Sequence, residues 1–193
     1  STSADPGRWR TIIGEVRRVY SGTLSYSANW DEVARVPFWD ALDVIGVSFY
    51  APLAERATRD PGELRTGAAR ALETLRSVGR RFRRPVLISE LGYASSAEAA
   101  VRPWDESRGS PDPETQRACY EATLAAIEPC TWLAGAFFWK WSSAARAGND
   151  AFDPRGRSIE PVVLRALRDW QGRPVRVPEA PRGSAPPAGR GLR

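Results

Sequence analysis

Residues 85–90 have the sequence PVLISE, a short apolar run that begins at a proline and ends at a carboxylate. Its length and its β-branched residues are typical of a buried strand. A helix is predicted before it, from about Gly62 to Arg83, and another after it, from Asp112 to Glu128. A strand at residues 85–90 followed by a loop and a helix is therefore predicted.

The same order recurs on both sides of residues 85–90. One apolar strand is predicted at Asp43–Tyr50, before the helix that precedes PVLISE. Another is predicted at Ala134–Trp141, and a helix from about Ile159 to Trp170 follows it after a loop. Residues 23–28 form a further short strand upstream. Strands and helices thus alternate along most of the chain.

An amphipathic helix is predicted at Asp5–Tyr20, with Asp5 as its N-cap and Pro6 at its first position. Four apolar strands, each followed by a helix, indicate a parallel sheet covered by helices. Four such units are half of an eight-unit barrel, for which about 250 residues is usual. The predicted fold class is α/β, the C-terminal half of a (β/α)8 TIM barrel comprising strands 5 to 8. The alternative is an open doubly wound sheet, but no Gly-rich phosphate-binding turn follows any strand.

The half-barrel domain is assigned to residues 1–172. From residue 173 to residue 193 the sequence is rich in Pro, Arg and Gly without apolar periodicity, which predicts a disordered tail. The chain begins at Ser1 and contains no Met, so we expect it to be a piece of a longer protein. The missing N-terminal half of the barrel is then its expected partner.

Charge and composition exclude several classes of function. The net charge is +5, but the densest basic cluster, residues 76–84, falls where a helix should end and where cations offset the helix dipole. No nucleic-acid module signature accompanies it, so no nucleic-acid partner is expected. The absence of His removes the Ser/His and Cys/His nucleophile systems and the commonest metal ligands, and we expect no metal and no cofactor. No run of eighteen apolar residues is present, so no membrane span is expected.

In a barrel of this kind the active site collects where the strands end. A sugar ring stacks its C–H face on an indole and needs directional polar partners for its hydroxyls, so aromatic, amide and carboxylate groups around one mouth predict a carbohydrate ligand. The candidate residues at the strand ends are Asn29, Trp30, Tyr50, Glu90, Tyr93, Trp139 and Trp141.

Each candidate has a structural alternative. Glu90 could form a salt bridge or contact a helix dipole, and Tyr50 could simply cap the barrel rim. Trp139 and Trp141 share one face of their strand, because alternate residues do, and could pack in the core. Asp43 begins its strand, at the opposite and structural end, and is assigned no catalytic role.

Five segments carry a family resemblance when taken together. They are LSYSANW at 24–30, FWDALDVIGVSFY at 38–50, ISELGY at 88–93, GAFFWKW at 135–141 and FDPRG at 152–156. As a set they resemble family 113 of the glycoside hydrolases, which includes β-1,4-mannanases and belongs to a large barrel clan with retaining chemistry. The resemblance extends over about residues 8–170.

The resemblance implies a role for most of the candidates. Glu90 would be the nucleophile that attacks the anomeric carbon, and Tyr50 would orient it. Asn29, Trp30 and Trp139 would line the sugar subsites. Tyr93 and Trp141 are also assigned to substrate binding, because they lie at strand ends. The family's acid/base Glu ends the fourth strand, which should stop just before Ser1, so the chain would hold one of the two carboxylates that retaining hydrolysis needs.

The sequence therefore predicts a fragment of a retaining glycoside hydrolase that acts on a β-linked polysaccharide, with β-1,4-mannan as the best precedent. The fragment alone is expected to be inactive. A non-catalytic carbohydrate-binding barrel is the first alternative, and a basic interaction module that uses the Arg cluster is the second. Localisation is unknown from the sequence, with a secreted or periplasmic full-length protein expected.

Overall fold

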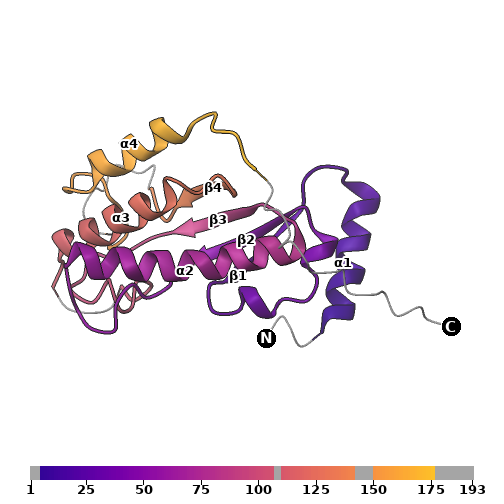
Figure 1. Cartoon of the computed structure of the whole chain (residues 1–193), viewed down its shortest axis with the longest axis horizontal. Coiled ribbons are helices and arrows are strands. Elements are labelled where there is room, and N and C mark those ends of the chain that lie inside the picture. The colour runs from indigo at the N-terminus through magenta and orange to yellow at the C-terminus, as the bar shows by residue number, and fades with distance from the viewer. Residues whose placement is uncertain (1–4, 107–109, 142–149, 177–193) are drawn as a thin grey trace.

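The computed structural model describes residues 5–106, 110–141 and 150–176. Within them the chain forms a parallel sheet flanked by α-helices (Figure 1). The strands are β1 (Ser25–Asn29), β2 (Val44–Phe49), β3 (Val86–Leu91) and β4 (Leu133–Phe138). The helices are α1 (Pro6–Val19), α2 (Pro61–Phe82), α3 (Pro113–Ile127) and α4 (Glu160–Trp170).

The strands pair in chain order, β1-β2-β3-β4, and every pair is parallel. The predicted starts of α1, α2 and α3 are confirmed to within a residue, as is the predicted cap of α1. All three helices begin with a proline after an aspartate whose carboxylate accepts a backbone N–H of the first turn, although this was predicted only for α1. The capping residues are Asp5, Asp60 and Asp112. From β2 onward each strand is followed by a helix, as predicted.

The main core lies between one face of the sheet and the helices that cover it. Ile45, Val47 and Phe49 alternate along β2 and are buried on that face. Helix α2 turns a stripe of buried residues toward the sheet, namely Leu64, Ala68, Leu72 and Leu75. Figure 1 shows α2 lying along the sheet, with α1 at the end where the strands begin.

The connection from β1 to β2 differs from the prediction. The expectation of a helix after every strand is wrong here, because the connection holds only two short 3-10 helices, Val33–Arg35 and Trp39–Ala41. The indole N–H of Trp39 donates to the carbonyl of Val33 over 2.9 Å and its ring is fully buried. Trp39 also packs against Phe38 and Tyr26, with ring centroids 6.2 Å and 5.8 Å away, so an aromatic cluster occupies the place of a helix. Pro37 in mid-segment is unfavourable for a helix.

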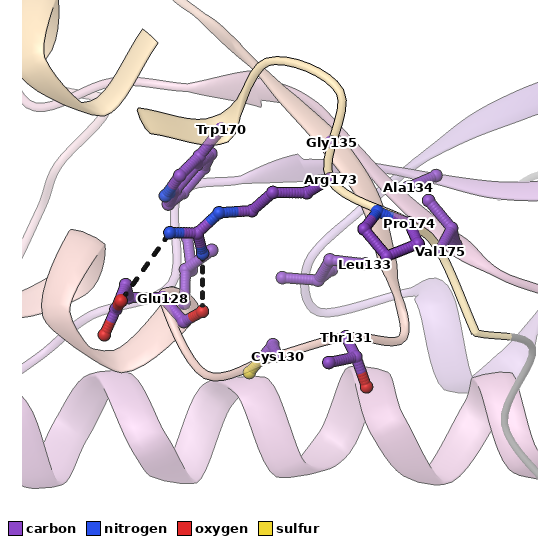
Figure 2. Close-up of a pocket in the computed structure, with 11 residues that line it drawn as sticks. Glu128, Cys130, Thr131, Leu133, Ala134, Gly135, Trp170, Arg173, Pro174 and Val175 are labelled. Atoms are coloured by element: carbon purple, nitrogen blue, oxygen red, sulfur yellow. Dashed lines mark hydrogen bonds and ion pairs between the residues drawn. The ribbon is translucent and has the colours of Figure 1, made fainter. Parts of the chain in front are cut away.

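The last described residues contact the turn before β4 and the ends of α3 and α4. The backbone N–H of Arg176 donates to the carbonyl of Thr131 over 2.7 Å. The Arg173 guanidinium donates to the carbonyl of Asp169 at the end of α4 and to that of Glu128 at the end of α3. Figure 2 shows Arg173 directed at Glu128 beside Trp170, around a cavity of about 150 Å³. Residues 177–193, the rest of the predicted tail, lie outside the described residues.

None of the helices in the described part of the chain is both long enough and apolar enough to cross a lipid bilayer.

Candidate active site

The site lies on the sheet face opposite the main core, at the end where the strands stop. Register pairing aligns Asn29 with Ser48, and Ser48 with Glu90, across three neighbouring strands. Side chains at these positions form one row at the carboxyl edge of the sheet. Parallel α/β folds place their functional groups at this edge.

A bulge in β3 decides where Glu90 points. Val47 pairs with Ile88 but Ser48 pairs with Glu90, so Ser89 is an extra residue opposite β2. With strict alternation Ser89 and Glu90 would face opposite sides of the sheet. The bulge instead turns both toward the polar face, where Ser89 contacts Ser27 and Glu90 contacts Ser48. Alternation in the sequence alone could not reveal this bulge.

Both carboxylate oxygens of Glu90 accept a hydrogen bond. The phenol of Tyr50 donates to Oε2 over 2.9 Å, and the hydroxyl of Ser48 donates to Oε1 over 3.2 Å. Burial, followed by the hydrogen bond and charge of Glu90, raises the pKa of Tyr50 above its usual value. The phenol is therefore a proton donor to the carboxylate at neutral pH. Tyr50 and Glu90 are thus hydrogen-bonded, and the orienting role of Tyr50 stays a prediction.

The Tyr50 ring is itself held from the loop that follows β4. Phe152 is buried and meets Tyr50 edge-on, with ring centroids 6.2 Å apart. Next to it, the buried carboxylate of Asp153 pairs with Arg155 over 2.7 Å. Gln116 of α3 is fully buried and donates to the carbonyl of Ala151 in the same loop. This support was not predicted, although Phe152 lies in one of the segments that carry the resemblance.

The tryptophans after β4 are accessible. Trp139 is 43% exposed and Trp141 is 41% exposed, so neither is packed in the core. The backbone N–H of Trp139 donates to the carbonyl of Leu91 over 2.8 Å, which ties the end of β4 to the end of β3. The ammonium group of Lys140 lies over the Trp139 ring and pairs with Asp150. An exposed indole is available for stacking beside the carboxylate strand.

The first strand contributes a second aromatic group. Trp30 follows Asn29 and stacks against Trp104, with centroids 6.4 Å apart and an interplanar angle of 23°. Trp104 comes from the loop after β3 and is 48% exposed. The sequence did not single it out as a site residue, and its only signal was an aromatic residue in a long loop.

Tyr93 is a correction. A contact with sugar was expected, but the side chain is completely buried and its hydroxyl is hydrogen-bonded to Thr123 of α3 over 2.7 Å. Its ring meets Tyr120 edge-on at 5.1 Å. Two residues beyond the last β3 residue the chain has already turned toward the helices, so Tyr93 belongs to the core.

Other charged groups have structural roles. Asp43 pairs with Arg17 of α1 and accepts the backbone N–H of Leu24. In the basic cluster, Arg84 donates to two backbone carbonyls of the β1–β2 connection and Arg81 lies over the Phe82 ring. Among the described residues no group of three His, Cys, Asp or Glu side chains could hold a metal ion.

Comparison with known proteins places this geometry in a family. The family model described as Glycoside Hydrolase Family 113 matches residues 1–158. The chain belongs to glycoside hydrolase family 113. This membership agrees with the resemblance carried by the five segments.

Solved family 113 structures share the fold. A GH113 β-1,4-mannanase is 24% identical with a TM-score of 0.73, covering 87% of this chain and 52% of that one. The GH113 β-mannanase AaManA from Alicyclobacillus acidocaldarius, in complex with ManMIm, is 28% identical with a TM-score of 0.70, covering 83% and 50%. A β-glucuronidase from Faecalibacterium prausnitzii, 13% identical with a TM-score of 0.58, shares the fold over 83% of this chain and 28% of its own.

This family 113 chain spans about half the length of the mannanase structures. Its four-stranded parallel sheet therefore corresponds to half of a TIM barrel. A search of curated proteins found no match.

Proposed function

We propose that this chain is part of a retaining β-mannanase and supplies its nucleophile, Glu90. The observation that carries the proposal is a carboxylate at the carboxyl edge of the sheet with both oxygens held, by Tyr50 and Ser48. Membership of family 113 supports the glycoside hydrolase class. Mannan is favoured because the similar family 113 structures are β-mannanases.

In the proposed mechanism Glu90 attacks the anomeric carbon as its bond to the leaving glycosidic oxygen breaks, which forms a covalent glycosyl-enzyme. Water then hydrolyses this ester and frees Glu90. Tyr50 orients the carboxylate through Oε2. The exposed indole of Trp139 stacks beneath the sugar ring being cleaved, while Asn29 and Trp30 contact neighbouring sugars. Trp141 extends the aromatic surface on the β4 side.

The second carboxylate, which protonates the leaving oxygen, is proposed to come from a segment outside these 193 residues. Retaining enzymes hold the two carboxyl groups about 5 to 5.5 Å apart. The half-length match to the mannanases supports this arrangement. The chain alone would then bind oligosaccharide without turning it over.

The test is expression of the full-length protein that joins this chain to the missing half, with mannohexaose as substrate. We expect hydrolysis with retention of the anomeric configuration, seen by proton NMR, and a loss of about 10³-fold or more in kcat for Glu90→Gln. Glu121→Gln, which alters an exposed carboxylate of α3 paired with Arg117, is the control. Oligosaccharide binding with no turnover in any variant would instead indicate a non-catalytic carbohydrate-binding barrel.

A further inference from the structure

Three serine hydroxyls form a continuous line beneath Glu90. Ser89 Oγ lies 2.5 Å from Ser27 Oγ, and Ser27 Oγ lies 3.2 Å from Ser48 Oγ. Ser48 Oγ in turn lies 3.2 Å from Oε1 of Glu90. The line runs from Ser89 on β3 to Ser27 on β1, then to Ser48 on β2 and to Glu90 on β3. It therefore joins the three strands whose side chains form the row at the carboxyl edge.

The protons of this line have one consistent arrangement. An ionised carboxylate only accepts, so the single hydroxyl proton of Ser48 must point to Oε1 of Glu90. Ser48 can then only accept from Ser27, and Ser27 can only accept from Ser89. Three contacts use three protons, and each is donated in the direction of the carboxylate.

We infer that Ser89, Ser27 and Ser48 act as a hydrogen-bond relay that orients Glu90, with Ser48 as a positioning residue for Oε1. Each donor in such a chain polarises the next, which strengthens the final bond to the charged group. Tyr50 holds Oε2 at the same time, so rotation of the carboxylate about its last bond is opposed from both sides. The β3 bulge is required, because it puts Ser89 and Glu90 on one face.

The inference rests on the proposed role of Glu90, and the kinetic test uses the full-length protein. Ser48→Ala is expected to lower kcat roughly tenfold, with KM changed less than twofold, because a hydrogen bond to a charged group is lost. Ser48→Thr, which keeps the hydroxyl, should retain most of kcat. Ser27→Ala should lower kcat by a smaller factor, and should add nothing once Ser48 is Ala.

The matched control is Ser25→Ala. Ser25 lies two residues before Ser27 on the same face of β1, and its hydroxyl donates to the backbone carbonyl of Tyr26 over 3.5 Å, outside the serine line. The Ser25→Ala variant should have the same kcat as the parent protein. Equal losses for Ser25→Ala and Ser27→Ala, or multiplicative losses for Ser27→Ala and Ser48→Ala, would overturn the relay.

A second measurement separates the relay from the proposed function. In the 193-residue chain, Ser48→Ala should lower the midpoint of thermal unfolding less in a Glu90→Ala background than in the parent, because the two side chains interact. Additive shifts would reject the relay whatever the kinetics. If Glu90→Gln leaves turnover intact, the proposed function fails, and this cycle still decides whether Ser48, the last member of the relay, interacts with Glu90.

Discussion

Tyr50 and Glu90 lie at the ends of neighbouring strands, and the phenol of Tyr50 donates a hydrogen bond of 2.9 Å to Oε2 of Glu90. Phe152 meets the Tyr50 ring from the side. Burial and the nearby carboxylate raise the pKa of the phenol, so Tyr50 remains a donor at neutral pH. The direction of the carboxylate is therefore set largely by its neighbour on the next strand.

Tyr50→Phe should lower kcat of the full-length protein by about 10- to 100-fold, because a hydrogen bond to a charged group contributes about 1.5 to 3 kcal/mol. The ring and its contact with Phe152 are kept, so folding should be preserved in circular dichroism. Tyr20→Phe, at an exposed position after α1, is the control and should leave kcat unchanged. Equal activity for the two variants would contradict an orienting role for Tyr50.

Asp153→Asn should lower the free energy of unfolding by about 2 kcal/mol at pH 7, because Arg155 loses its buried partner. The hydrogen bond from Arg155 lowers the pKa of Asp153 below its usual 3.8. A lowered folded-state pKa gives stability that is present above the unfolded value and lost as the pH falls through the folded one. Urea unfolding should therefore show a constant difference at pH 5 to 7 that narrows below about pH 4. A difference that does not change with pH would exclude the ion pair as its source.

Gly67→Ala should destabilise the chain although alanine is the better helix former. A Cβ at Gly67 would lie 1.8 Å from the carbonyl oxygen of Leu53, so α2 would have to move away from the loop after β2. We expect a loss of more than about 2 kcal/mol. Gly14→Ala in α1, where a Cβ meets nothing within 4 Å, should instead add about 0.5 to 1 kcal/mol. Thermal unfolding of both variants checks the opposite signs.

Arg173→Ala should lower the free energy of unfolding by about 1 kcal/mol, because the guanidinium joins the carboxyl ends of α3 and α4. Its contact with Glu128 of α3 is drawn in Figure 2. Lysine should not restore it, since one ammonium cannot reproduce the forked contacts. Arg165→Ala, at an exposed site in α4, should have little effect. Chemical denaturation of the three variants would reject this role if Arg173→Ala matched Arg165→Ala.

Helices and strands could be predicted closely because their signals are local. The apolar period gave the starts of α1, α2 and α3 to within a residue, and for α1 the cap Asp5 and Pro6 were predicted as well. The features that were predicted wrongly or missed depend on contacts between residues far apart in the sequence. The β3 bulge is a property of the pairing between β3 and β2. Tyr93 points into the core, where its hydroxyl is hydrogen-bonded to Thr123 of α3. The β1–β2 connection was misjudged because buried Trp39 packs where a helix was expected.

The strand order β1-β2-β3-β4 has a consequence for synthesis. Each of β2, β3 and β4 pairs with the strand made just before it, so within the described sheet none of these three pairings waits for a later strand to leave the ribosome. The loop-closure entropy of each pairing is limited to one crossover. The sheet can therefore grow by one strand at a time as the chain emerges, with every new helix covering the strand that precedes it from β2 onward.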